Sequence, residues 1–236
     1  MSELIFVRHG QASFGKESYD KLSDLGVRQA KLLAKHWRDM GEQFDHIYAG
    51  TLLRQKETAE QLIPLVKGSP ARPYFKAAFN EYNGDSLLRI YMRDHLSRDK
   101  VNAAKEWPIK DERVFQNLFE LATAKWIKNE LKPSIADSDF ESWETFKNRV
   151  YRAIDETMEA HTSGSKVLIS TSGGVIAMAL QKVLNFPDEH VISTNWMIHN
   201  SSVTRVRYGN DKVSLTQFNS LPHMEMKDIK HLITYR

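Results

Sequence analysis

The sequence has no cysteine among its 236 residues. This excludes a disulfide scaffold, a cysteine nucleophile and a metal site built on thiolates. No stretch approaches the ~18 consecutive apolar residues that a membrane span needs. The apolar run at residues 4–7 is also too short for the core of a signal peptide. We therefore expect a cytoplasmic protein with no membrane partner.

An excess of charge of one sign is also missing. The formal net charge is +3, and the Lys and Arg residues are scattered among Asp and Glu. Domains that bind nucleic acid cluster their basic residues on one face, so we expect no nucleic-acid partner. The composition, 41% hydrophobic and 27% charged, is ordinary for a globular protein. A chain of this length can bury a large core, and we predict a single domain over residues 1–236.

Short apolar runs alternate with amphipathic stretches along the chain. Runs at residues 4–7, 45–49 and 166–170 are bounded by polar or turn-forming residues, which is typical of buried strands in a parallel sheet. Ser23 is a good N-cap for the first helix. Helical patterns occur at residues 24–40, 53–65, 143–158 and 175–184. This alternation predicts an α/β fold with three layers, α/β/α, around a mostly parallel central sheet.

Other segments are less regular. Residues 72–79 fit either an edge strand or an extended connector. Residues 86–131 combine a helical pattern with dense charge, which indicates either a helical insertion that forms a lid over the site or a solvated helical excursion. Residues 202–208 and 212–218 flank a Gly-Asn-Asp turn, which predicts a C-terminal β-hairpin.

Three predicted strands end just before residues that suit a phosphate site. Arg8 and His9 follow the first strand, and Arg54 lies in the first turn of the helix after the second. A Thr171-Ser172-Gly173-Gly174 turn leads from the strand at 166–170 into the predicted helix at 175–184. Because the carboxyl ends of parallel strands meet at one edge of a sheet, we expect these loops to open together. Glu81 can reach the same edge from its connector.

Each of these residue types has a use in phosphoryl transfer. A phosphomonoester carries roughly −1.5 to −2 charges at pH 7, and the planar fork of Arg binds its oxygens bidentately. The backbone amides of Gly173 and Gly174, at a helix start, add further donors. A neutral His9 can attack phosphorus, and neighbouring Arg charges lower its pKa. Glu81 can protonate the leaving group and then activate the water that cleaves the phosphohistidine.

Short stretches along most of the chain form an ordered set: Val7-Arg8-His9-Gly10-Gln11, Leu22-Ser23-Asp24-Leu25-Gly26 with Gln29-Ala30, Leu52-Leu53-Arg54 with Glu57-Thr58-Ala59, Glu81, Glu141-Ser142 with Arg149-Val150, and Ser172-Gly173-Gly174-Val175-Ile176. Together they resemble the histidine phosphatase superfamily, the phosphoglycerate mutase-like branch 1. The resemblance implies a mostly parallel sheet covered by helices and a phosphohistidine intermediate. It also implies His9 as nucleophile, Arg8 and Arg54 as clamps, and Glu81 as general acid.

The chain departs from the family pattern at Ser172, where the family usually carries a second His that donates to the transferring phosphoryl group. A hydroxyl can donate one hydrogen bond but brings no charge. Removing one preorganised donor typically costs ~10²–10³ in kcat, so we expect a weaker clamp in an enzyme that is still active. The residues expected to contact the substrate are Ser172, Gly173, Gln11 and Tyr82.

We predict a phosphatase that hydrolyses phosphomonoesters, with a phosphorylated small molecule as its substrate and no cofactor. No His pair shows metal-ligand spacing with a carboxylate, so we predict no metal. The first alternative is a phosphomutase of the same fold, although Gln11-Ala12-Ser13-Phe14 does not match the residues that mutases usually carry. The second is a phosphate-binding regulatory protein weakened in catalysis. A serine hydrolase centred on Ser172 is disfavoured, because Ser170 stands where the Gly-x-Ser-x-Gly motif needs glycine. The sequence is compatible with a homodimer and does not fix the oligomeric state.

Overall fold

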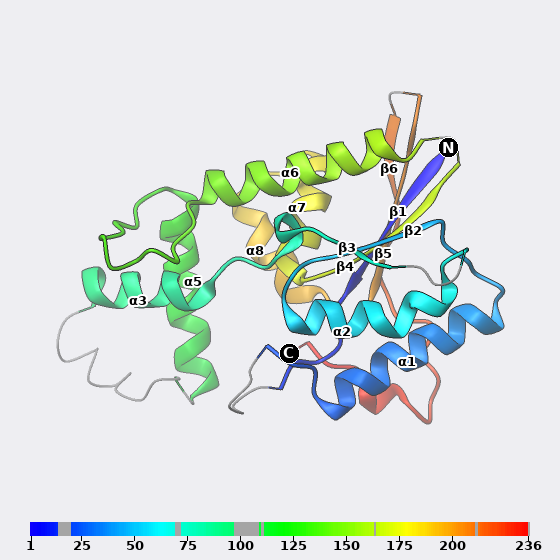
Figure 1. The fold of residues 1–236 in the computed structure, drawn as a ribbon. Coiled ribbons are helices and arrows are strands. Elements are labelled where there is room, and N and C mark those ends of the chain that lie inside the picture. Colours follow the sequence, from blue (N-terminus) through cyan, green and yellow to red (C-terminus); the bar gives the residue numbers. More distant parts are fainter. Residues whose placement is uncertain are drawn as a thin grey trace. The chain divides into compact units, whose positions relative to one another are not determined.

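The computed structural model describes these residues of the chain: 1–13, 20–68, 72–96, 109, 111–162, 164–210 and 212–235. The chain divides into two compact units (Figure 1). The first consists of Met1–Glu81 with Val150–Arg236, and the second of Tyr82–Arg149. The segment 86–131 belongs to the second unit, and its residues 97–108 and 110 lie outside the described part. Its role as a lid stays a prediction.

A six-stranded sheet forms the centre of the first unit. Its strand order is β3-β2-β4-β1-β5-β6, and β3, β2, β4 and β1 run parallel. The last two strands form the predicted hairpin, which pairs antiparallel with β1. The strands are β1 (Ser2–Arg8), β2 (His46–Ala49), β3 (Tyr74–Phe75), β4 (Lys166–Thr171), β5 (Val203–Gly209) and β6 (Lys212–Ser220). The predicted α/β fold with a mostly parallel central sheet is confirmed.

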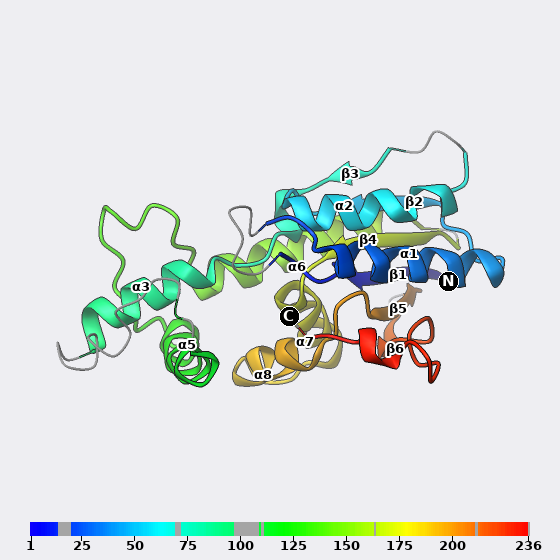
Figure 2. The ribbon, with the colours of Figure 1, turned by 90° about the horizontal axis from the view of Figure 1, so that it is seen from below.

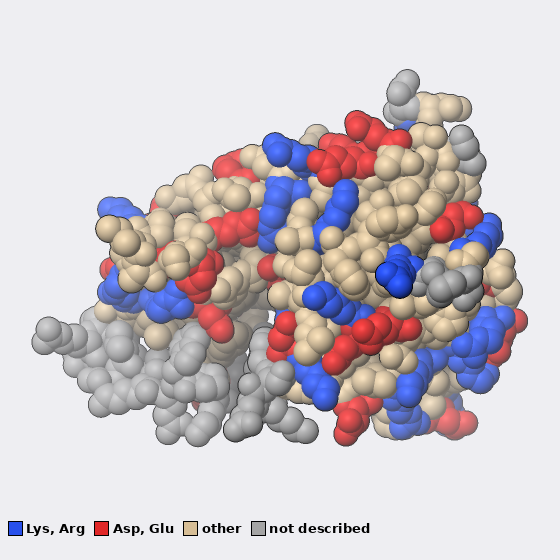
Figure 3. All heavy atoms as spheres, viewed as in Figure 1, with Lys and Arg blue, Asp and Glu red and all other residues tan. Residues whose placement is uncertain are grey.

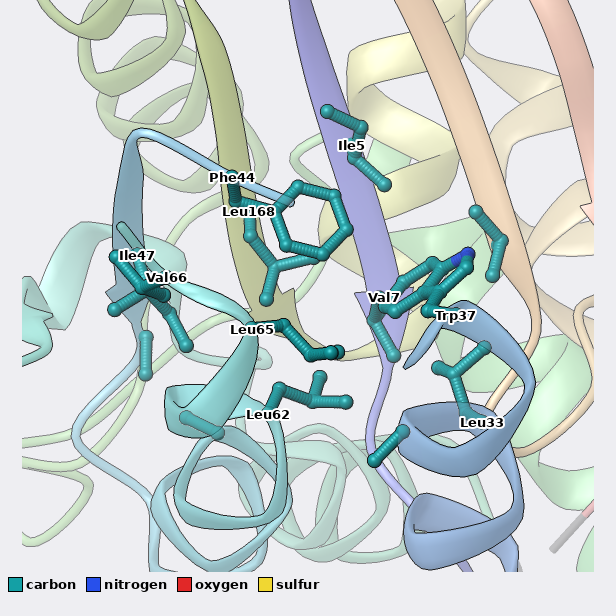
Figure 4. Packing of buried hydrophobic residues seen from close by; sticks show 14 residues of the cluster. Ile5, Val7, Leu33, Trp37, Phe44, Ile47, Leu62, Leu65, Val66 and Leu168 are labelled. Carbon is teal, nitrogen blue, oxygen red and sulfur yellow. The ribbon is translucent and has the colours of Figure 1, made fainter. Parts of the chain in front are cut away.

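Helices cover both faces of this sheet. Helices α1 (Asp24–Asp39) and α2 (Leu53–Leu62) lie on one face, and α7 (Gly173–Leu184) lies on the other (Figures 1 and 2). Figure 4 shows the core under α1 and α2, where apolar side chains of the strands meet those of the two helices. Successive strand residues point to opposite faces, and the runs in β1 and β4 are apolar throughout because both faces are buried. This packing fixes the carboxyl ends of β1, β2 and β4 at one edge.

The remaining predictions for the first unit have mixed outcomes. The predicted helix at 53–65 is α2 followed by a short 3₁₀ helix, Ile63–Leu65. The ambiguous segment 72–79 contains the edge strand β3 and a 3₁₀ helix, Ala77–Phe79. The sequence pattern does not predict α8 (Glu189–Met197), which packs beside α7.

A close backbone contact requires glycine at position 10. Gly10 is not among the described glycines with positive φ. A Cβ added to Gly10 would lie 2.3 Å from the carbonyl oxygen of Gly26, and one added to Gly26 would lie 2.1 Å from that of Gln11. The loop after β1 therefore passes backbone against backbone over the first turn of α1.

The second unit is described over two helices, α3 (Gly84–His95) and α5 (Glu112–Ile127), and the beginning of α6 (Trp143–Ala160), which continues into the first unit. Aromatic rings form its core. The Tyr82 ring centroid lies 4.8 Å from that of Trp126 and 5.4 Å from that of Phe146.

The surface carries charge of both signs. On the face shown in Figure 3, Lys and Arg lie among Asp and Glu. Among the described residues, no helix combines the length and the apolar character that crossing a membrane requires. The same residues contain no group of three or more His, Asp or Glu side chains placed to hold a metal ion.

Ser23 is confirmed as the N-cap of α1, since its Oγ accepts a hydrogen bond from the Gly26 amide at 3.0 Å. We expect Ser23→Ala to lower the free energy of unfolding by about 1 kcal/mol, the usual cost of losing such a cap. Urea denaturation monitored by circular dichroism measures this. Ser214→Ala, at an exposed position on β6, is the matched control and should change stability by less than about 0.5 kcal/mol. Equal stabilities of the two variants would contradict the capping role.

Candidate active site

His9 lies directly beyond the end of β1 and is only 6% exposed. Its Nδ1 is 2.7 Å from the carbonyl oxygen of Gly10, and its Nε2 is 3.1 Å from Nε of Arg54. A carbonyl only accepts hydrogen bonds and the guanidinium of Arg54 only donates them. The ring proton is therefore on Nδ1, and the lone pair of Nε2 accepts from Arg54.

The surroundings of His9 keep its ring neutral. Burial holds the pKa of His9 well below its ordinary value of 6.5, and the charges of Arg54 and Arg8 lower that pKa further. The hydrogen bond with the Gly10 carbonyl raises the pKa of His9, but this effect is smaller than the lowering. An imidazole in this state has a free electron pair on Nε2 over the whole neutral pH range, which a nucleophile requires.

Arg54 has a second partner, Asp20, that the sequence does not point to. Nη1 of Arg54 forms an ion pair with Oδ1 of Asp20 at 2.5 Å. The carbonyl oxygen of Asp20 accepts from the Arg54 amide, and its Oδ2 accepts from the Leu53 amide at 2.7 Å. Asp20 thus supports both the first turn of α2 and the direction of the Arg54 side chain, with Nε toward His9.

Arg8 is the last residue of β1, and Nη1 of its guanidinium donates to the carbonyl of Ile198. The backbone of Arg8 and His9 is held from the other side by the loop before β5. The Ser201 amide is 3.0 Å from the Arg8 carbonyl oxygen, and the Asn200 side chain donates to that of His9 at 3.2 Å. His9, the predicted nucleophile, and Arg8, a predicted clamp, are thereby held in place at the end of β1.

The predicted acid reaches the predicted helix start. Oε2 of Glu81, a partly buried residue, accepts a hydrogen bond from the Gly174 amide at 3.0 Å. A Cβ added to the preceding Gly173 would lie 2.1 Å from Oδ1 of Asn195 on α8. At the N-cap position, Oγ of Ser172 accepts from Nε2 of Gln55 at 2.9 Å. Gln55 and Asn195 were not identified from the sequence.

Gln11 and Tyr82 are the two remaining residues predicted to contact the substrate. Gln11 belongs to the loop after β1, and its Oε1 accepts from the Ser23 hydroxyl at 2.8 Å. Tyr82 lies in the second unit, where its ring packs in the aromatic core. The first unit thus gathers Arg8, His9, Arg54, Glu81, Ser172 and Gly173 at the carboxyl ends of its strands. Their contacts with a substrate, and those of Gln11 and Tyr82, stay predictions.

Residues 232–234 are hydrogen-bonded to side chains next to the loops that flank His9. The side chain of Gln29 accepts from the Gln11 amide and donates to the Leu232 carbonyl and the Thr234 hydroxyl, each at 2.8–2.9 Å. Thr234 in turn donates to the side chain of Asn200 at 2.9 Å. Residues 232–234 are therefore joined to both loops that flank His9.

A second buried histidine lies behind the same loop. His223 is 2% exposed, and its Nε2 is 2.8 Å from the Ser201 hydroxyl. Its Nδ1 has no hydrogen-bond partner among the described residues. Burial, followed by the charge of His36, lowers the pKa of His223 to about 3.

This histidine makes the protein sensitive to acid. The unfolded chain takes up the proton near pH 6.5, before the folded state does, so stability is complete above that pH and falls below it. The slope is about 1.4 kcal/mol per pH unit, or about 2 kcal/mol between pH 6.5 and pH 5. We expect His223→Asn to remove this loss, measured as the difference between urea midpoints at pH 7 and pH 5. His190→Asn, at an exposed position on α8, is the control. An unchanged difference in His223→Asn would refute the assignment.

Chemically, the arrangement offers an unprotonated nitrogen influenced by two guanidinium groups, and a carboxylate at the start of α7. Guanidinium groups bind phosphate oxygens in a fixed fork, and the carboxylate lies at the N-terminus of α7, where the helix dipole favours negative charge. This combination can hold a phosphoryl group and present a nucleophile to it.

The chain is similar to proteins of known kinds over most of its length. A sequence profile of the histidine phosphatase superfamily (branch 1) matches residues 4–113 and 103–221. The phosphoglycerate mutase of Schizosaccharomyces pombe is 21% identical over 196 residues, which cover 80% of this chain and 82% of that protein. The 2,3-bisphosphoglycerate-dependent phosphoglycerate mutase of Rhizobium meliloti is 20% identical over 198 residues, covering 81% and 84%.

Solved structures with the same fold include YhfR of Bacillus stearothermophilus, with a TM-score of 0.67, 18% identity and coverage of 95% of this chain and 100% of that one. Another is the phosphoserine phosphatase of Entamoeba histolytica, in complex with 3-phosphoglyceric acid, with a TM-score of 0.62, 16% identity and coverage of 94% and 99%. At these identities the structures show the fold alone. The profile match extends from the first strand through the C-terminal hairpin, and this chain belongs to the histidine phosphatase superfamily, branch 1.

Proposed function

We propose that the protein is a phosphatase that hydrolyses phosphomonoesters of small molecules through a phosphohistidine intermediate on His9. The observation that carries this proposal is the state of the His9 ring, with its proton on Nδ1 against Gly10 and its Nε2 lone pair facing Arg54. Attack on phosphorus needs this unprotonated nitrogen beside a cationic clamp.

In the first step, the Nε2 lone pair of His9 attacks phosphorus and the bond to the ester oxygen breaks. Arg54 must leave Nε2 before this attack, and its guanidinium is placed to move onto a phosphoryl oxygen. Arg8 holds another oxygen. Glu81 gives a proton to the departing alkoxide, which leaves as an alcohol.

In the second step, the carboxylate of Glu81 takes a proton from water. The resulting hydroxide attacks phosphorus, the phosphorus–nitrogen bond breaks and inorganic phosphate leaves. His9 returns to its neutral form and Glu81 to its protonated form. The Ser172–Gly173 turn supplies neutral hydrogen-bond donors to the oxygens in both steps.

The related proteins support either hydrolysis or transfer. Phosphoglycerate mutases and a phosphoserine phosphatase both occur among them. In a mutase, a hydroxyl of a second molecule takes the place of water in the second step. The stretch Gln11-Ala12-Ser13-Phe14 differs from what mutases usually carry after the Arg-His-Gly motif, and we favour hydrolysis for this reason.

The experiment that tests the proposal is turnover of a panel of phosphorylated metabolites and of p-nitrophenyl phosphate. Samples are quenched during turnover and assayed for released alcohol, for inorganic phosphate and for acid-labile phosphate on the protein. We expect alcohol and inorganic phosphate in equal amounts, with label on His9.

The alternatives give different results in the same assay. A mutase would release less inorganic phosphate than alcohol when an acceptor hydroxyl is added, because the phosphoryl group goes to the acceptor. A regulatory protein would bind phosphate without turnover and without label on His9, and either result would refute the proposed hydrolysis.

A further inference from the structure

Gln55 is a buried polar residue of α2 that lies against Ser172, the position at which the family pattern has a second histidine. Gln55 is fully buried, and Nε2 of its side chain is 2.9 Å from Oγ of Ser172. The same Nε2 donates to the carbonyl of Phe79 at 3.0 Å. Gly50 leaves room for this amide, because a Cβ at that position would lie 1.8 Å from Oε1 of Gln55.

The orientation of the Gln55 amide follows from its partners. Oε1 accepts from the Leu52 amide at 3.3 Å, and Nε2 faces the carbonyl of Phe79. A flipped amide would place oxygen against a carbonyl and nitrogen against an N–H group, which loses both bonds. Both hydrogens of Nε2 are therefore committed, one to Phe79 and one to Ser172.

This fixes what the hydroxyl of Ser172 can do. Its oxygen accepts from Gln55, so its single hydrogen must be donated elsewhere. It does not cap α7, and no further partner of Oγ occurs within the described part of the chain. The hydrogen is thus available to a ligand.

The strand register places Ser172 beside the nucleophile. Arg8 pairs with Thr171 in the parallel register of β1 and β4, and the His9 amide donates to the Thr171 carbonyl at 2.8 Å. His9 and Ser172 are the residues that directly follow the ends of β1 and β4. Neighbouring strands lie about 4.8 Å apart, and paired residues project to the same face. A phosphoryl group on Nε2 of His9 is therefore within reach of a donor at position 172.

We propose that Gln55 is a positioning residue that holds the Ser172 hydroxyl as a neutral hydrogen-bond donor to the phosphoryl group transferred to His9. This inference rests on the proposed phosphatase function. A buried serine alone could rotate its hydrogen toward other acceptors. With Gln55 in place, the oxygen is occupied as an acceptor, so the donor direction toward the ligand is set before the reaction.

Gln55→Glu tests this, because it keeps the shape of the side chain but replaces the donor at Nε2 with an acceptor. The Ser172 hydroxyl then donates to the new carboxylate and is withdrawn from the phosphoryl group. We expect kcat for p-nitrophenyl phosphate to fall about 10²-fold, similar to the loss in Ser172→Ala, while KM changes much less.

The double variant is the decisive measurement. If Gln55 acts through the hydroxyl, Gln55→Glu combined with Ser172→Ala loses little more than Ser172→Ala alone. Gln55→Met, which carries no charge, should lower kcat by about tenfold in the presence of Ser172 and leave it nearly unchanged beside Ser172→Ala. Thermal denaturation of each variant separates these effects from a loss of folded protein.

The possible failures are distinguishable. If the losses in kcat of Gln55→Glu and Ser172→Ala multiply in the double variant, Gln55 does not act through the Ser172 hydroxyl. A wild-type kcat in both Gln55→Glu and Gln55→Met would also overturn the role of Gln55. Full activity in Ser172→Ala, with phosphohistidine still formed on His9, would overturn the donor role while the proposed phosphatase function stands. Absence of phosphohistidine in the wild-type protein would remove the proposed function itself.

Discussion

Under the proposed function, His9→Ala is expected to lower kcat for phosphomonoester hydrolysis by at least ~10⁴-fold, because the variant lacks the side chain on which the phosphohistidine would form. The two guanidinium groups stay in place, so the variant should still bind inorganic phosphate. Steady-state kinetics with p-nitrophenyl phosphate, together with phosphate binding by calorimetry, measure both parts of this expectation.

The matched control is His190→Ala, at an exposed position on α8, which should have the wild-type kcat. Residual activity of His9→Ala within tenfold of the wild type would show that another group attacks phosphorus. The pH profile adds a second check. The pKa of His9 lies well below 6.5, so the imidazole stays unprotonated on going from pH 8 to pH 6.5 and should cause no loss of kcat/KM in that interval.

Gly26→Ala is expected to destabilise the protein by about 3 kcal/mol, although alanine is the better helix former by about 1 kcal/mol. The new methyl group would lie 2.1 Å from the Gln11 carbonyl oxygen and 2.8 Å from its amide nitrogen. Both atoms belong to the backbone, so no side chain can rotate away, and the loop after β1 must shift as a whole. Urea denaturation measures the loss.

The same shift should also lower the catalytic activity, because Gln11 is two residues from His9. We expect kcat/KM of Gly26→Ala to fall by about 10²-fold in the fraction that remains folded, since small displacements of a nucleophile have effects of this size. Lys31→Gly, at an exposed position on the same helix, is the control and should cost only about 1 kcal/mol with unchanged kinetics. A Gly26→Ala protein as stable and active as the wild type would contradict the close backbone contact.

The sequence predicts the elements whose pattern is local. The apolar runs of β1 and β4 are bounded by polar residues, and Ser23 marks the beginning of α1. Helix α8 has no such pattern. Its two buried residues, Val191 and Ile192, are adjacent in sequence, and its stability comes from packing beside α7, which a periodicity cannot show.

The residues of the candidate site also fall into those that the sequence predicts and those that it does not. Arg8, His9 and Arg54 lie at or just beyond the ends of strands, so their meeting at one edge could be predicted from the order of elements. Asp20 and Gln55 could not be predicted. Asp20 lies in a loop 34 residues before Arg54, and a glutamine in the first turn of a helix is normally exposed. Only the packing of α2 against the ends of the strands buries Gln55 against Ser172.

The hydrogen bonds that residues 232–234 make near His9 have a practical consequence for handling the protein. Proteolytic cleavage just before Leu232 would leave the Gln29 amide with neither of its acceptors and Asn200 without the Thr234 hydroxyl. Such damage would lie more than 200 positions from His9 in the chain, yet it would loosen the loops on both sides of that ring. Preparations cleaved at this point should therefore differ from the intact protein in specific activity, and mass spectrometry of each batch would reveal the cleavage.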